Sequence, residues 1–138
     1  MEDYVTYEQA VKLKELGFDW ECNHLYSHRS SIDFIDLTYY NDFNTTDSSK
    51  DYSAPTLAQV QKWLREKHNI IILVETYFKN YMDGDYSKVE FEYVIVSMNL
   101  NAARKSSSQD DKLFGTYEQA LSCGIDKSLE LLELLSKN

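Results

Sequence analysis

The sequence predicts one domain of the α+β class, with a helix–hairpin–helix–hairpin–helix order and an antiparallel sheet of about four strands. Three segments show helical periodicity after a shared start signal, and two segments rich in β-branched and aromatic residues flank an Asp-Gly turn. The 138 residues suffice for a single core. We therefore expect one globular domain over residues 1–138, with the helices mainly on one face of the sheet.

The three helices are predicted from a repeated capping signal. Thr6, Thr56 and Thr116 each stand three residues before a Gln, the spacing at which the two residues bond each other's backbone N–H. The pentapeptide Thr-Tyr-Glu-Gln-Ala occurs at 6–10 and at 116–120, and its different flanks favour two independent caps over an internal duplication. Apolar periodicity then predicts helices at 7–16, 57–67 and 117–136.

Two residues are expected to end helices, and one glycine lies inside a helix, where a close contact would explain it. Gly17 and Asn69 follow the first two helices and tolerate the left-handed conformation found at helix ends. Gly124 lies inside the third helix, where glycine costs about 1 kcal/mol relative to alanine. A close approach of a neighbouring strand would account for it.

The clearest hairpin lies between the second and third helices. Its strands are expected at 70–81 and 89–100, joined by a turn at Asp83-Gly84-Asp85. Both faces of the second strand are apolar around 93–96. Either a bulge changes the register there, or both faces of the sheet are covered.

A second, weaker hairpin is expected between the first two helices. Its strands would cover 24–26 and 34–40, with a turn at 29–31. The stretch Ser-Ser-Ser-Gln-Asp-Asp at 106–111 is the best candidate for a mobile segment. Two segments rich in small polar residues are expected to be loops, at 41–55 and 101–113.

The charge balance argues against polyanionic partners. The chain has 23 acidic and 14 basic residues and a net charge of −9, which disfavours nucleic acid and anionic membrane surfaces. No segment approaches the ~20 apolar residues needed to span a bilayer, and the acidic start lacks an apolar run. We therefore expect a cytoplasmic protein without membrane contact. The densest basic cluster is expected to be the solvated face of a helix: Lys62, Arg65, Lys67 and His68.

Cys22, His24 and His28 are close enough in sequence to be considered as a metal site or a thiol–imidazole dyad. Zinc sites usually combine two paired half-sites, and a thiol nucleophile needs an orienting group and an oxyanion turn, none of which the sequence offers. We therefore predict no metal, no cofactor and no catalytic residue. Cys22 and Cys123 are expected to be free, packed thiols, because disulfides are rare in the cytoplasm.

Two carboxylate pairs have simple structural explanations. Asp83 and Asp85 flank a glycine and fit ordinary turn chemistry. Glu90 and Glu92 alternate along a strand and are expected on its solvent face. The four glycines are isolated, so no phosphate-binding loop is predicted.

Three stretches carry a family resemblance. Residues 5–19, 52–70 and 115–135, which include all three predicted helices, resemble a group of short proteins from Bacteroides-type bacteria, their phages and mobile elements. The family has no assigned activity, so the resemblance implies no catalytic residue. It implies a small α+β domain in a bacterial or phage-infected cytoplasm, with an accessory role in a mobile element.

Two functions compete at this point. The first is a non-enzymatic interaction protein that binds a protein partner or itself through the second sheet face; an acidic mimic of DNA is one version of it. The alternative is a small ligand-binding domain or enzyme with an aromatic cleft near His24 or His28. Aromatic side chains would make the contacts in either case: Tyr39, Tyr40, Tyr52 and Trp63 in the cleft, and Tyr77 on the hairpin.

Overall fold

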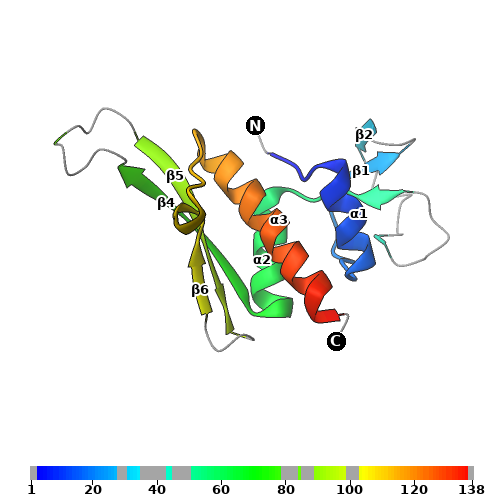
Figure 1. Ribbon diagram of the computed structural model, residues 1–138. Coiled ribbons are helices and arrows are strands. Elements are labelled where there is room, and N and C mark those ends of the chain that lie inside the picture. Colours follow the sequence, from blue (N-terminus) through cyan, green and yellow to red (C-terminus); the bar gives the residue numbers. More distant parts are fainter. Residues whose placement is uncertain are drawn as a thin grey trace. The chain divides into compact units, whose positions relative to one another are not determined.

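The computed structural model describes residues 3–27, 31–34, 43–44, 51–78, 84, 89–98 and 103–136. These residues form helices and antiparallel strands, as the α+β class requires (Figure 1). Contacts group the chain into two compact units, Met1–Val60 with Leu129–Asn138, and Gln61–Ser128. Helices α2 and α3 contribute residues to both units.

The three predicted helices are confirmed to within one residue at each end. They are α1 (Tyr7–Glu15), α2 (Leu57–His68) and α3 (Tyr117–Ser136). Gly17 and Asn69 have φ angles of 92° and 55°, so both take the left-handed conformation expected after α1 and α2. No helix in the described residues is long and apolar enough to cross a membrane.

The capping signal works as the spacing predicts. Thr6 N donates to Gln9 Oε1 at 2.9 Å, and Gln9 N donates to Thr6 Oγ1 at 3.1 Å. The same reciprocal pair joins Thr56 and Gln59, at 3.0 and 3.1 Å. At α3, the N–H of residue 119 donates to the hydroxyl of residue 116 at 3.1 Å.

The first unit contains a three-stranded antiparallel sheet in the order β2-β1-β3. Its strands are β1 (His24–Ser27), β2 (Ser31–Phe34) and β3 (Tyr52–Ser53). The return strand thus begins at 31, inside the predicted turn, and its predicted continuation over 35–40 lies outside the described residues. The prediction of a loop over all of 41–55 is wrong at β3, which pairs with β1 through Leu25 and Tyr26.

The N-terminal segment of this unit is tied to the start of α2. Val5 N donates to Pro55 O at 3.1 Å, and Leu57 N donates to Asp3 O at 2.9 Å. Because Leu57 is the first residue of α2, the second bond satisfies an N–H that has no partner inside the helix. The largest fully buried side chains of the unit include Phe18, Leu13 and Leu129.

The second unit contains another three-stranded antiparallel sheet, in the order β4-β5-β6 (Figure 1). Its strands are β4 (Ile70–Phe78), β5 (Val89–Ser97) and β6 (Ala103–Ser106), and η3 (Ser107–Asp110) is a 3-10 helix after β6. The predicted hairpin is confirmed, but the single sheet of about four strands is wrong, because β3 and β6 each add a third strand to a separate hairpin. The prediction of a loop over 101–113 is wrong at β6 and η3, and the mobility predicted for 106–111 stays a prediction.

The apolar stretch of β5 lies in an unbroken register. Each residue of β4 pairs with one residue of β5, from Ile70 with Ser97 to Phe78 with Val89, so the bulge is excluded. Tyr93, Val94 and Ile95 are 5%, 0% and 3% exposed, which shows that both faces are covered there.

Gly124 makes the close approach predicted for it. A Cβ atom at this position would lie 3.0 Å from Ile72 Cγ2 and 3.1 Å from Tyr93 Cβ. The helix therefore meets β4 and β5 at the one residue of α3 that has no side chain.

Candidate functional site

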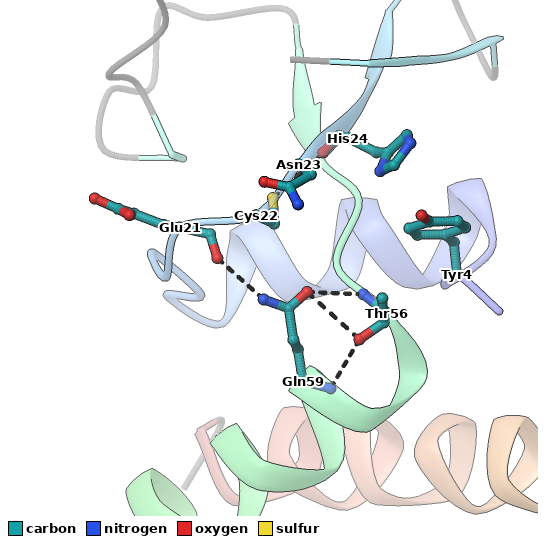
Figure 2. Close-up of a pocket in the computed structure, with 7 residues that line it drawn as sticks. All are labelled: Tyr4, Glu21, Cys22, Asn23, His24, Thr56 and Gln59. Atoms are coloured by element: carbon teal, nitrogen blue, oxygen red, sulfur yellow. Dashed lines mark hydrogen bonds between the residues drawn. The ribbon is translucent and has the colours of Figure 1, made fainter. Parts of the chain in front are cut away.

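A pocket of about 380 Å³ opens in the first unit. It lies where the segment before β1 meets the N-terminal turn of α2 and the N-terminal segment (Figure 2). Its lining is mostly polar and comes from Tyr4, Glu21, Cys22, Asn23, His24, Thr56 and Gln59.

The α2 side of the pocket is occupied by the capping box. Gln59 Oε1 accepts from Thr56 N, and Gln59 Nε2 donates to Glu21 O at 3.1 Å (Figure 2). One end of this amide therefore caps α2, and the other end holds the segment before β1 against the helix. The first N–H groups of the helix are also bonded within the protein, which weakens the case for an anion site there.

His24 is the pocket residue with unused hydrogen-bonding capacity. Its ring centroid lies 4.3 Å from that of Tyr4 and 5.6 Å from that of Phe34. Its Nδ1 atom is buried and has no hydrogen-bond partner among the described residues. Because Nδ1 is buried, a small polar molecule in the pocket would bond it only if the ring turned between its two aromatic neighbours.

Cys22 is buried, and its surroundings do not activate the thiol. It is 4% exposed and belongs to a small apolar cluster with Leu25 and Phe43. Burial raises the pKa of its thiol, although hydrogen bonds from its surroundings oppose that effect. The Sγ–H donates to the backbone oxygen of His24 at 3.3 Å, so the thiol is not paired with the imidazole as a nucleophile would be.

The other residues that were considered as reactive groups do not form a site in the described part of the chain. Both cysteines are free thiols. No cluster of three His, Cys, Asp or Glu side chains suited to a metal ion occurs among the described residues, and His28 lies outside them.

The predicted aromatic contact residues have different surroundings. Tyr39 and Tyr40 lie outside the described residues. Tyr52 stacks edge-on against Tyr7 and lies under Lys14 Nζ, which is 5.1 Å from the ring centroid. Trp63 is 2% exposed and contacts His68 at 4.5 Å between centroids, so it presents little surface to a ligand. Tyr77 is 38% exposed on β4, where a partner can reach it.

The outer edge of β4 is a second candidate site, defined by the register of the sheet. Met98 N donates to Asn69 O, so odd-numbered residues of β4 direct their backbone groups toward β5 and even-numbered residues direct theirs outward. Gln61 Nε2, from α2, donates to the outward oxygen of Ile72 at 2.8 Å. Beyond this bond, the described residues provide no partner for the outward backbone groups of Val74 and Thr76.

The side chains of this edge segment are exposed. Leu73 and Tyr77 are 40% and 38% exposed on one face, and Phe78 is 38% exposed on the other. Sequence periodicity shows which side chains share a face, but the direction of the backbone groups follows only from the pairing with β5. That is why sequence reasoning identified Tyr77 and missed the edge.

The one acidic side chain of β4 is partly neutralised. Glu75 is paired with Arg104 of β6 at 3.8 Å, and both side chains are half-exposed. Glu92 lies directly opposite Glu75 and is 9% exposed, so the prediction that Glu92 faces solvent is wrong. The covering of both faces of β5 buries it, and its Oε2 has no hydrogen-bond partner among the described residues.

Comparison with protein-family models, curated proteins and solved structures finds no match to this chain. The choice between the pocket and the β4 edge therefore depends on their own chemistry. The pocket is lined by an imidazole whose unsatisfied nitrogen is buried, whereas the edge offers outward backbone groups beside exposed apolar side chains.

Proposed function

We propose that this chain is a non-enzymatic interaction protein that binds a protein partner by strand addition at the outer edge of β4. The observation that supports it most directly is the unpaired edge at Val74 and Thr76, which begins where Gln61 stops covering the strand. An extended segment of a partner would bond these groups as a fourth strand, and exposed side chains beside them would select it.

The β4 edge lacks the features that usually keep an edge strand from pairing with other chains, which supports a role in binding a partner. Natural edge strands usually carry lysine, proline or a bulge that prevents pairing with other chains. Residues 73–78 contain none of these, and their single charge, on Glu75, is engaged by Arg104. The net charge of −9 makes a polypeptide a better partner than nucleic acid or an anionic membrane.

Two substitutions at one position test this function. Thr76→Pro removes the outward N–H without touching a bond to β5, and Thr76→Val keeps that N–H with a side chain of similar shape. Immobilised wild type, Thr76→Val and Thr76→Pro proteins are compared for the partners that they retain from a cell extract. A partner held by the first two and lost with the third supports strand addition, and retention independent of Thr76 contradicts it.

The ligand-binding alternative now depends on fewer residues. It depends on His24 and the polar pocket, because Trp63 is buried and Tyr39, Tyr40 and His28 lie outside the described residues. A small polar molecule that bonds His24 Nδ1 would have to turn the imidazole ring toward this pocket. Amide shift changes at Asn23, His24 and Gln59 on addition of polar fragments, lost in His24→Phe, would support it.

Several broader expectations stay predictions beside this proposal. They are the single-domain organisation with helices mainly on one sheet face, the cytoplasmic location, and the accessory role in a bacterial or phage mobile element that the resemblance implies.

A further inference from the structure

We infer that the partner segment added at the β4 edge is basic, with a lysine or arginine directly opposite Glu75. This inference rests on the proposed function and states the chemistry of the partner. Carboxylates gather on one face of the second sheet at this edge. The backbone of β4 presents Glu75 there at the point where an added strand comes closest.

Three carboxylates lie on one face of the sheet, at and beside the open edge. Glu75 of β4 is directly opposite Glu92 of β5, and Glu90 lies two residues before Glu92, so the three side chains share this face. Like charges directly opposite each other destabilise a strand pair. Among the described residues of β4, β5 and β6, Arg104 is the one basic residue on the same face, as the pairing of β5 with β6 shows.

One guanidinium leaves this face short of positive charge. Arg104 reaches Glu75 at 3.8 Å, but the two side chains are 58% and 43% exposed, and ion pairs this exposed contribute little to stability. Glu92 is 9% exposed, and its Oε2 has no hydrogen-bond partner among the described residues. A carboxylate so poorly solvated is stabilised by a cation brought near it. The edge therefore favours a cationic side chain over a neutral or an acidic one.

The backbone pairing places one residue of an added strand close to Glu75. Val74 and Thr76 direct their backbone groups outward, so they would form the hydrogen-bonded pairs with an antiparallel strand. Glu75 lies between them and would form a non-hydrogen-bonded pair, in which opposite side chains are closest. A lysine or arginine at this position of the added strand would lie beside the Glu75 carboxylate.

The positions two residues to either side of this basic residue should be apolar. Leu73 and Tyr77 flank Glu75 on the same face and are 40% and 38% exposed. Apolar side chains opposite them would remove this area from water. The pairing stops at Leu73, because Gln61 occupies the outward oxygen of Ile72. The expected pattern of the added strand is apolar–x–basic–x–apolar.

Synthetic peptides that differ only at the central residue test the charge. Val-Thr-Lys-Thr-Val, capped at both ends, fits the pattern, and Val-Thr-Gln-Thr-Val and Val-Thr-Glu-Thr-Val are its neutral and acidic counterparts. Binding to the full-length chain is followed by the amide shifts of Val74 and Thr76, with up to about 5 mM peptide. The Lys peptide should bind about 2- to 5-fold more tightly than the Gln peptide and about 2- to 30-fold more tightly than the Glu peptide. Equal affinities, or no binding of the Lys peptide, overturn the inference.

Variants of the protein show whether Glu75 makes the selection. Glu75→Gln should remove the preference among the three peptides, and Glu75→Lys should invert it, because the charge at the edge is then reversed. Glu66→Lys changes the net charge by the same amount at an exposed position of α2, outside the sheet, and should keep the wild-type order. A Glu75→Lys chain that still prefers the Lys peptide overturns the inference.

The outcomes separate this inference from the proposed function. Peptides that bind equally well whatever their central charge, and that lose binding in Thr76→Pro, refute a basic partner and leave strand addition standing. The same holds if no peptide binds while a protein is still captured from a cell extract in a Thr76-dependent manner. Peptide binding that is unchanged in Thr76→Pro refutes both.

Discussion

Replacing Gly124 with alanine separates two effects of opposite sign. In an ordinary helix interior, alanine is more favourable than glycine by about 1 kcal/mol. In this helix, the new Cβ would lie 3.0 Å from Ile72 Cγ2, 3.1 Å from Tyr93 Cβ and 3.3 Å from Tyr93 Cγ. The last two atoms sit close to the backbone of a buried central strand, so they have little freedom to move away.

The steric cost should exceed the helical gain. Adding a methyl group to a well-packed core costs about 1–3 kcal/mol, and the rigid neighbours place this site toward the upper end. Subtracting a helical gain of about 1 kcal/mol leaves a net destabilisation of about 1–2 kcal/mol. For a domain of this size that corresponds to a melting temperature lower by about 4–8 °C.

Urea unfolding followed by circular dichroism measures this difference. Lys62 is exposed in the middle of α2, so Lys62→Gly should be less stable than Lys62→Ala by about 1 kcal/mol, which calibrates the helical term in the same protein. Gly124→Ala should lower the unfolding midpoint without changing the slope. A variant as stable as wild type, or more stable, would refute the close packing of α3 on β4 and β5.

Three further predictions concern the cap, a histidine and the thiols. Thr56→Ala should cost about 1 kcal/mol of thermal stability because it removes the α2 cap, while Thr56→Ser should retain most of it; equal melting temperatures would contradict the capping role. Burial lowers the pKa of His68 below its usual 6.5, so the unfolded state takes up the proton first and stability falls as pH drops from 6.5 through the folded-state pKa. His68→Gln should therefore lose less stability than wild type between pH 7 and 5.5, and parallel losses would show that His68 makes no such contribution. In Cys123→Ser, where Cys22 is the only thiol, a disulfide reagent at pH 8 should react far more slowly with the native protein than with the denatured one; equal rates would contradict the burial of Cys22.

Features that depend on local sequence were predictable. The three Thr-to-Gln spacings encode bonds between neighbours in the chain, so the starts of α1, α2 and α3 needed no tertiary information. The same holds for the left-handed residues after α1 and α2. Even the contact at Gly124 was inferable, because a glycine inside a strongly periodic helix requires a reason.

Features that depend on distant partners were not predictable. Tyr52–Ser53 and Ala103–Ser106 are short and lack alternation, and they become strands because β1 and β5 offer unpaired edges beside them. Glu92 looked like a solvent-facing residue because polar residues usually mark the open face of a strand. The pocket combines His24 with Gln59 of α2, and the sequence around either residue does not indicate the other.

The proposed strand addition requires an open edge of β4 beyond Ile72, which amide hydrogen exchange measures directly. In dilute solution, the amides of Val74 and Thr76 should exchange rapidly, whereas those of Leu73 and Glu75, directed toward β5, should be protected. Protection of Val74 and Thr76 equal to that of their neighbours at every dilution would show that the chain itself covers this edge, and would contradict the account.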